Sequence, residues 1–286
     1  MRSPRIILSR KGFDASYGGY PSIILSDVNK SISFPIPAND KDQFSTIFYQ
    51  QRSYLDIYTD LGFIPKVNGS KQLGAHLDPD LRFESKPRKK GWRPSLGQAN
   101  AALSHLDNFE IDHGDIFIFF GWFKFASKDN GKYSYMTSPP NQYIDFKNDL
   151  HVCYGYLEVD QVFDVRFDKL PEWLMDHPHA RYRDKPNKIY VAKEQFSYNL
   201  ELPGAGPLPF SRDAILTAPG MSRSKWKIPK SIFDKSEITY HPNPWKKGYF
   251  QSAYIGQEFV IKDVTESILH YFLNIISPQL FYKKAG

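Results

Sequence analysis

Hydrophobic residues gather in short runs separated by polar turns along most of the chain, and these runs predict more strands than helices. Alternating or continuous apolar stretches predict strands at residues 5–9, 23–25, 32–34, 116–120, 122–125, 133–136, 151–165 and 258–261. Asp129-Asn130-Gly131 between two aromatic runs indicates a hairpin, and Asp27 and Asn29 mark the turn of an earlier one. Helical spacing predicts helices at residues 44–61, 95–106 (with Ser95 as the cap) and 265–276.

The order of these elements predicts an α+β, β-rich fold. Strands and helices follow one another without the strand–helix–strand rhythm of a doubly wound sheet, and no repeat of fixed period is present. Residues 62–94 lose periodicity and predict a long connection rich in glycine, proline and charge. Because no low-complexity linker divides the chain, we expect residues 1–281 to form one intertwined domain, with residues 282–286 as a polar tail.

Composition narrows the class of protein. A single cysteine, Cys153, excludes an intramolecular disulfide and a thiolate-rich metal site, and it fits a reducing cytoplasm. No apolar run approaches the roughly 18 residues of a membrane span, so we expect no membrane partner. The run Ile6-Ile7-Leu8 is too short for the core of an export signal.

Charge and aromatic content point to nucleic acid. The chain has 37 basic and 31 acidic residues, a net charge of +6, and 16% aromatic residues. Basic side chains bind phosphates and aromatic faces stack on bases. The alternative is a β-rich core, which also favours Phe and Tyr, under a mildly basic surface.

Two segments concentrate candidate chemistry. Arg10 and Lys11 follow the first strand, where two cations would hold a phosphate beside Gly12; an exposed basic turn is the alternative. His76, Asp78 and Asp80 alternate, so on an extended segment they would share one face and present an imidazole and two carboxylates to a metal or a labile proton. A turn whose carboxylates bind their own backbone is the alternative there. A run of cations would hold a nucleic-acid backbone nearby: Arg82, Arg88, Lys89, Lys90 and Arg93.

Glu258 and several histidines are further candidates. A glutamate at the head of an apolar strand is costly to bury unpaired, so Glu258 is expected at a cleft or beside a base such as Arg10 or Lys11. His177-Pro178-His179, His105, His113 and His151 would bind a metal only if the fold brought them together, and zinc-finger spacing is absent. We therefore predict no metal ligands, and the sequence indicates no cofactor.

The middle of the chain resembles a known barrel. Gly114-Asp115 before one aromatic strand, and residues 151–159 ending in Glu158-Val159, are similar to the central strands of PUA-like barrels, the superfamily of the EVE, YTH and ASCH domains. The resemblance implies a barrel at about residues 110–170 that holds RNA or a modified base in an aromatic pocket, lined here by Trp122, Tyr154 and Tyr156.

Motifs spread over most of the chain resemble one family as a set. They are Ile7-Leu8-Ser9-Arg10-Lys11-Gly12-Phe13-Asp14, Gly18-Gly19, His76-Leu77-Asp78-Pro79-Asp80-Leu81, Gly91-Trp92-Arg93-Pro94, Gly97-Gln98, Ser104-His105-Leu106, Gly114-Asp115-Ile116-Phe117-Ile118-Phe119-Phe120-Gly121, His177-Pro178-His179, Thr217-Ala218-Pro219-Gly220 and Gly256-Gln257-Glu258-Phe259-Val260. The chain resembles the nucleotide-modification-associated domain 3 family of phage and bacterial DNA-modification systems. The resemblance implies DNA-base modification, with partner proteins of such a system, and names no reaction.

The residues and the resemblance together predict a DNA-base-modification enzyme. Its candidate acid–base residues are His76, Asp78, Asp80, Glu258 and Asp14, and its candidate base readers are Trp92 and Gln98. One alternative is a non-enzymatic PUA-like reader of modified bases in DNA or RNA. A further alternative is an ADP-ribosyltransferase or a base-excising glycosylase.

Overall fold

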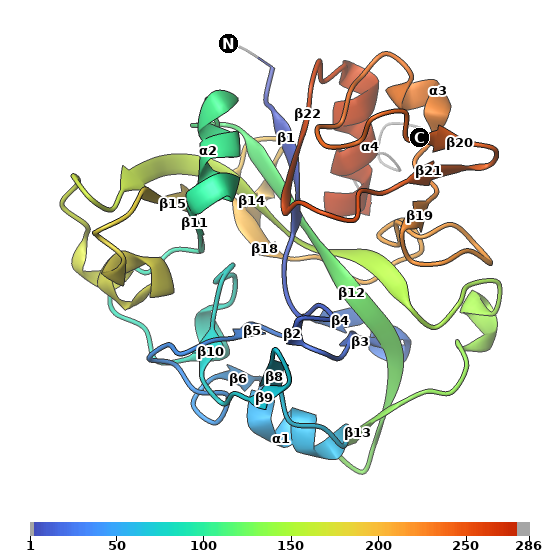
Figure 1. The fold of residues 1–286 in the computed structure, drawn as a ribbon, viewed down its shortest axis with the longest axis horizontal. Helices are drawn as coiled ribbons and strands as arrows, with labels where there is room; N and C mark the ends of the chain where they lie inside the picture. The colour runs from blue at the N-terminus through green and yellow to red at the C-terminus, as the bar shows by residue number, and fades with distance from the viewer. Residues whose placement is uncertain (1–2, 279–286) are drawn as a thin grey trace.

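The computed structural model of the protein describes residues 3–278 (Figure 1). The expected polar tail at residues 282–286 lies outside the described residues. The largest sheet contains ten of the described strands: β1 (Ile6–Arg10), β3 (Ser22–Leu25), β4 (Lys30–Ile32), β11 (Ser95–Ala99), β12 (Ile116–Asp129), β13 (Lys132–Tyr135), β14 (Leu150–Asp164), β15 (Asn187–Ala192), β18 (Ala205–Pro207) and β22 (Glu258–Ile261).

Short strands and helices complete the fold. The smaller sheets contain β2 (Tyr17–Gly18), β5 (Ile36–Pro37), β6 (Phe48–Tyr49), β7 (Arg52–Ser53), β8 (Lys66–Val67), β9 (Ser70–Lys71), β10 (Ala75–His76), β16 (Gln195–Phe196), β17 (Asn199–Pro203), β19 (Lys225–Trp226), β20 (Trp245–Lys246) and β21 (Tyr249–Gln251). The helices are α1 (Tyr54–Asp60), α2 (Asn100–Asn108), α3 (Lys230–Phe233) and α4 (Glu266–Ile276), with 3-10 turns η1 (Ser26–Val28), η2 (Phe83–Ser85), η3 (Asn141–Tyr143), η4 (Glu172–Asp176) and η5 (Pro178–Arg181). The expected α+β, β-rich class is confirmed.

The main sheet is strongly curled, like half of a barrel. Its two long strands, β12 and β14, pair antiparallel through a register shift at Phe119 and Phe120, and such a bulge bends the strand and increases its twist. β1 is buried on both faces and lies between β12, to which it is parallel, and β22, to which it is antiparallel. This pairing brings the two ends of the sequence together.

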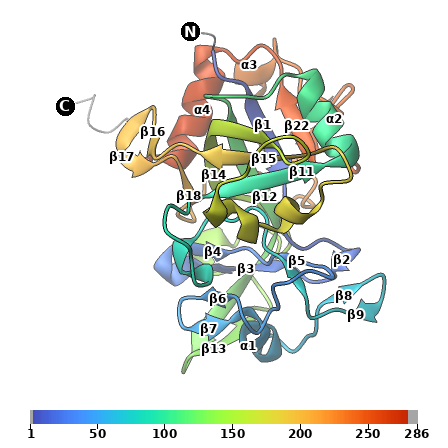
Figure 2. The same cartoon turned by 90° about the vertical axis from the view of Figure 1, so that its left-hand side faces the viewer.

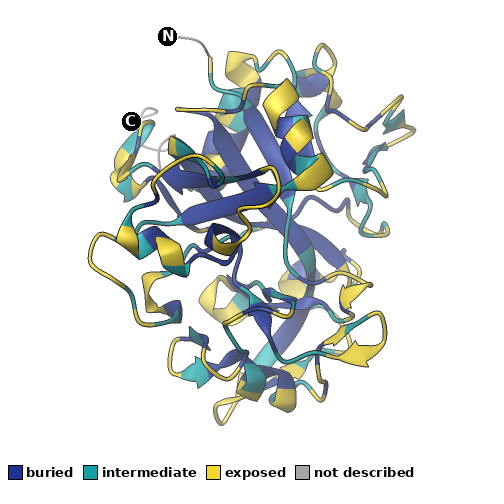
Figure 3. Cartoon of the chain, turned by 60° about the vertical axis from the view of Figure 1, so that its left-hand side comes forward, coloured by how far each residue is buried: buried dark blue, intermediate teal, exposed yellow. Residues whose placement is uncertain are grey.

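β12 connects two hydrophobic cores. Its first part packs in a core with β1, β14 and α4, and its end reaches a second core that contains α1 and Tyr133 of β13. Figure 2 shows α3 and α4 at one end of the molecule and α1 with the small strands β6 to β9 at the other. Figure 3 shows that the strands between them are buried, whereas the surrounding loops and helix faces are exposed.

The aromatic excess belongs mostly to these cores. Phe117, Phe119, Tyr154 and Tyr156 are buried among other core side chains, so Tyr154 and Tyr156 do not form the expected open aromatic pocket. Trp122 lies instead under the guanidinium of Arg223. Among the described residues, no helix has the length and the apolar composition that crossing a membrane requires.

Two predicted helices differ in the structure. Of residues 44–61, only Tyr54–Asp60 is an α-helix, because Gln50 adopts a φ of 54° and turns the chain into the β6–β7 hairpin. Ser53 then caps α1 by accepting a hydrogen bond from the Asp56 N–H.

Ser95, expected to cap a helix, begins β11 instead. β11 pairs with β15 along its length, and α2 begins only at Asn100. The alanines after Ala99 lie in α2, as their helical spacing predicts. Before Ala99, the pairing of Leu96 and Gly97 with β15 makes the chain a strand. The hairpin of β3 and β4 is present, but β4 ends at Ile32, where the predicted strand 32–34 begins, and the runs at 116–120 and 122–125 form the single strand β12. The other predicted strands and the helix at 265–276 overlap described elements.

Candidate functional site

A cleft of about 890 Å³ opens between α2, the loop before β22 and the segment around η5. Four buried or half-buried polar residues form what we call the floor of the cleft: His76, Gln98, His179 and Glu258. Three exposed tyrosines form its rim: Tyr182, Tyr240 and Tyr254. The volume lies within the range of roughly 300–1,000 Å³ that is usual for small-molecule sites.

Glu258 supplies the carboxylate of the floor and is buried, with 1% of its surface exposed. The register of β1 and β22 places it opposite Ser9, whose hydroxyl donates a 2.9 Å hydrogen bond to Oε1. The Gln98 amide also donates to Oε1, and Lys11 Nζ lies 3.3 Å from it. Oε2 has no hydrogen-bond partner among the described residues. The expectation that a base accompanies Glu258 is therefore confirmed for Lys11.

Asp78 lies beneath the floor and is surrounded by donors. The backbone N–H of Gly97 donates a 2.7 Å hydrogen bond to its Oδ1, and Lys11 Nζ lies 3.8 Å from its Oδ2. Burial alone would raise the pKa of Asp78, but His177 and Lys11 outweigh it and hold that pKa well below its usual range. Asp78 is therefore ionised, and Lys11 bridges two buried carboxylates.

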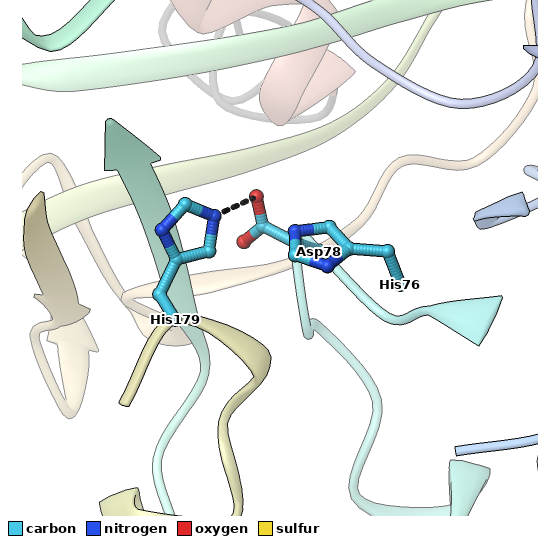
Figure 4. A group of neighbouring side chains, drawn as sticks. All are labelled: His76, Asp78 and His179. Atoms are coloured by element: carbon cyan, nitrogen blue, oxygen red, sulfur yellow. Dashed lines mark ion pairs between the residues drawn. The ribbon is translucent and has the colours of Figure 1, made fainter. Parts of the chain in front are cut away.

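The imidazoles of His76 and His179 meet beside Asp78 (Figure 4). His76 Nδ1 lies 2.8 Å from Oδ2 of Asp40, and His179 Nδ1 lies 2.6 Å from Oδ1 of Asn187. Burial is the main reason that the pKa of His179 is lowered to about 4, so this ring is neutral near pH 7. One ligand atom each from His76, Asp78 and His179 lies within 4.8 Å of the others, so these residues are able to hold a metal ion.

Asp80 does not join this group. Its carboxylate forms two 2.6 Å hydrogen bonds with the guanidinium of Arg88 and a 3.4 Å hydrogen bond with Trp92 Nε1. The same guanidinium stacks on Trp92, 4.4 Å from the ring centroid. Asp80, Arg88 and Trp92 thus form a separate, internally satisfied cluster.

The remaining predicted residues also lie outside the cleft. Asp14 accepts hydrogen bonds from the N–H groups of Ser16 and Tyr17 in its own turn. The Arg10 guanidinium donates to the carbonyls of Ala253 and Tyr254, so it holds the loop that forms one cleft wall.

Most cations of the 82–93 segment pair internally. Arg82 lies over the Tyr49 ring, Arg93 pairs with Asp160, and Lys89 pairs with Glu172, whereas Lys90 is exposed. None of the residues that line the cleft within the described chain comes from 82–93.

Several residues of the cleft are not among the site residues that the sequence predicts. In the sequence, His179 and His105 belong to a set of histidines without metal-binding spacing, and the rim tyrosines and Asp40 carry no local motif. The histidines that flank Pro178 were a signal for the site in the sequence, because η5 holds both rings next to Asp78. The rim tyrosines come from three separate loops, so no spacing in the sequence unites them.

Comparison with known protein families identifies the family of the chain. No curated protein and no solved structure matches the chain. Residues 5–262 match the family described as nucleotide modification associated domain 3, a span that includes every floor and rim residue of the cleft. Because the match covers nearly the whole chain, the chain belongs to the nucleotide modification associated domain 3 family.

Proposed function

We propose that the chain is an enzyme that modifies the base of a nucleotide, in DNA or free, bound in the cleft. Membership of the family ties the chain to nucleotide modification in general. The observation that carries the finer proposal is Glu258, a buried carboxylate that lines the cleft, pairs with Lys11 and keeps one oxygen without a hydrogen-bond partner among the described residues. A buried carboxylate that lines a cleft and keeps an unsatisfied oxygen is typical of sites that hold or move a proton.

The cleft has the groups that a nucleotide requires. Tyr240 and Tyr254 at the rim offer exposed aromatic faces, on which a base that has left its stack would lie. Gln98 on the floor donates one N–H to Glu258 and accepts from the Ala99 N–H, which leaves one N–H and one lone pair of its amide for the edge of a base. Lys185, exposed at the same cleft, supplies a positive charge for a phosphate.

In this proposal Glu258 exchanges a proton with the base through Oε2. Oε1 is held by Ser9, Gln98 and Lys11, which fixes the direction in which Oε2 points. Lys11 and Asp78 lie beneath the floor of the cleft. In this proposal they position Glu258 and do not bind phosphate. For a DNA substrate, we propose that the exposed Lys90 contacts phosphates outside the cleft.

Mass spectrometry of nucleosides from cells that express the protein tests this function. Wild type is expected to yield a nucleoside of new mass, and Glu258→Gln, which keeps the shape but loses the charge, is expected to abolish it. Glu237→Gln is the matched control, because Glu237 pairs with Lys262 at the surface. Unchanged nucleosides with tight oligonucleotide binding would favour a PUA-like reader, and release of free base or nicotinamide would favour a glycosylase or an ADP-ribosyltransferase.

A further inference from the structure

We propose that His76, Asp78 and His179 form a binding site for a divalent transition-metal ion at the floor of the cleft. These residues come from β10, the loop after it and η5, and one ligand atom of each lies within 4.8 Å of the other two. Figure 4 shows the two imidazoles on either side of the Asp78 carboxylate. The sequence predicted no metal ligands, because nothing in it places His179 beside His76.

The protons of the two imidazoles are fixed on their outer nitrogens. Asp40 Oδ2 lies 2.8 Å from His76 Nδ1, and the same carboxylate accepts from the Lys41 N–H and pairs with Arg181, so it is placed to accept the Nδ1–H of His76. The Asn187 amide nitrogen donates to the carbonyls of His179 and Tyr182, so its oxygen accepts from His179 Nδ1. Both rings are therefore left with a lone pair on Nε2.

A lone pair that faces a carboxylate forms a pair of acceptors that a cation between them would satisfy. His179 Nε2 lies 3.8 Å from Asp78 Oδ2, without a proton of its own to donate. Histidines bound to metals show this arrangement, in which the outer N–H donates to a carboxylate or carbonyl and the inner nitrogen binds the ion. Asp40 and Asn187 supply those outer partners here.

The third histidine beside Asp78 is excluded from the ligands by its proton. His177 Nδ1 accepts a hydrogen bond from the backbone N–H of His179, so its proton is on Nε2. That Nε2 lies 3.4 Å from Asp78 Oδ1, the oxygen that also accepts from Gly97. The Gly97 N–H thus holds Oδ1, with the His177 ring beside it, and Oδ2 is the oxygen that faces His179 and Lys11.

The donors select the class of ion. Two imidazole nitrogens and one carboxylate oxygen suit Zn²⁺, Fe²⁺, Mn²⁺ or Co²⁺, whereas Mg²⁺ and Ca²⁺ prefer oxygen ligands alone. Ligand bonds of about 2.0–2.2 Å bring neighbouring ligand atoms to roughly 3–3.5 Å, so small side-chain rotations complete the site. Because His76 and His179 line the cleft, the open coordination positions of the ion would face the bound nucleotide.

Cobalt titration of the purified protein without nucleotide tests this site independently of the proposed function. After dialysis against a chelator, Co²⁺ is expected to bind at about one equivalent, with a visible absorption spectrum of mixed nitrogen and oxygen ligation. His76→Gln and His179→Gln are expected to lose the spectrum. Asp40→Asn, which keeps the size of the side chain but removes the charge that faces His76 and Arg181, is expected to weaken binding by about 10- to 100-fold.

His105→Gln is the control, because His105 lines the same cleft outside the three ligands. It is expected to bind Co²⁺ as wild type does. Circular dichroism of each variant separates loss of binding from loss of folding. The metal site would be overturned if folded wild type bound no stoichiometric Co²⁺, or if both folded histidine variants bound Co²⁺ unchanged. Nucleotide binding, measured on the same samples, tests the proposed function separately.

Discussion

Lys11 Nζ lies 3.3 Å from Glu258 Oε1, although the two residues stand near opposite ends of the sequence. The parallel pairing of β1 with β12 and its antiparallel pairing with β22 bring them together. Lys11 also lies 3.8 Å from Asp78, so one ammonium group serves two buried carboxylates. The floor of the cleft is therefore assembled by the centre of the main sheet.

Removing the Lys11 charge should destabilise the fold. In Lys11→Met, Asp78 and Glu258 would remain buried without their shared cation, and breaking a buried ion pair costs about 3–5 kcal/mol. Urea unfolding measures the free energy of unfolding. Lys262→Met, which removes a surface partner of Glu237, should cost less than about 1 kcal/mol. Equal stability of the two variants would show that Lys11 is not needed to balance these carboxylates.

Gly97→Ala should disturb His179. A Cβ at position 97 would overlap the His179 imidazole, and forced overpacking of this kind typically costs about 1–3 kcal/mol. We expect a lower melting temperature and weaker Co²⁺ binding. Gly206→Ala is the control, because the nearest atom to its Cβ would be 4.0 Å away. A Gly97→Ala variant with the same melting temperature and Co²⁺ affinity as Gly206→Ala would contradict the close contact between Gly97 of β11 and His179 of η5.

Stability should fall in mild acid because of His241. Burial, helped by the charge of Arg10, lowers the pKa of His241 to about 4, whereas an unfolded histidine titrates near 6.5. Between these values only the unfolded state binds the proton, so the free energy of unfolding decreases as the pH falls from about 6.5 to 4, by up to about 3 kcal/mol. Urea unfolding across this range should show a smaller decrease for His241→Gln. Parallel curves for the two proteins would contradict the assignment.

Cys153 should be unreactive in the folded protein. It is fully buried, and burial raises the pKa of its thiol to about 12, so almost no thiolate exists at pH 8. A thiol reagent that reports by colour should label the native chain slowly and label one thiol per chain after urea is added. Rapid labelling of the native protein would place Cys153 nearer to the surface than the structure does.

The hydrophobic pattern predicted much of the fold. Runs such as Ile116–Phe120 are apolar at every position, as expected of a strand buried on both faces, and the first part of β12 is such a strand. The pattern was wrong at Ser95, where a serine before alanines has the features of a helix cap. Pairing of β11 with β15, a segment far along the chain, decides that position, and such pairing leaves no local signal.

The sequence predicted part of the site: His76, Gln98 and Glu258, which line the cleft. A buried Glu258 needs a cation, and Lys11 is that cation. Alternation along residues 76–80 did not keep Asp80 with His76 and Asp78, because Arg88 and Trp92 draw the Asp80 carboxylate into another cluster. His179 reaches Asp78 through η5, so its role depends on tertiary structure.

Photo-cross-linking with a DNA oligonucleotide that contains 5-iodo-2′-deoxyuridine tests most directly whether the cleft binds a base. Under ultraviolet light this base forms bonds to aromatic side chains in contact with it, and mass spectrometry of the peptides identifies them. The account predicts cross-links at the rim, to Tyr182, Tyr240 or Tyr254, and their loss in Tyr254→Ala or on competition with free nucleotide. Cross-links confined to the 82–93 segment, which contains Trp92, would contradict binding of the base in the cleft. A cross-link yield no higher than that of the unfolded chain would contradict it as well.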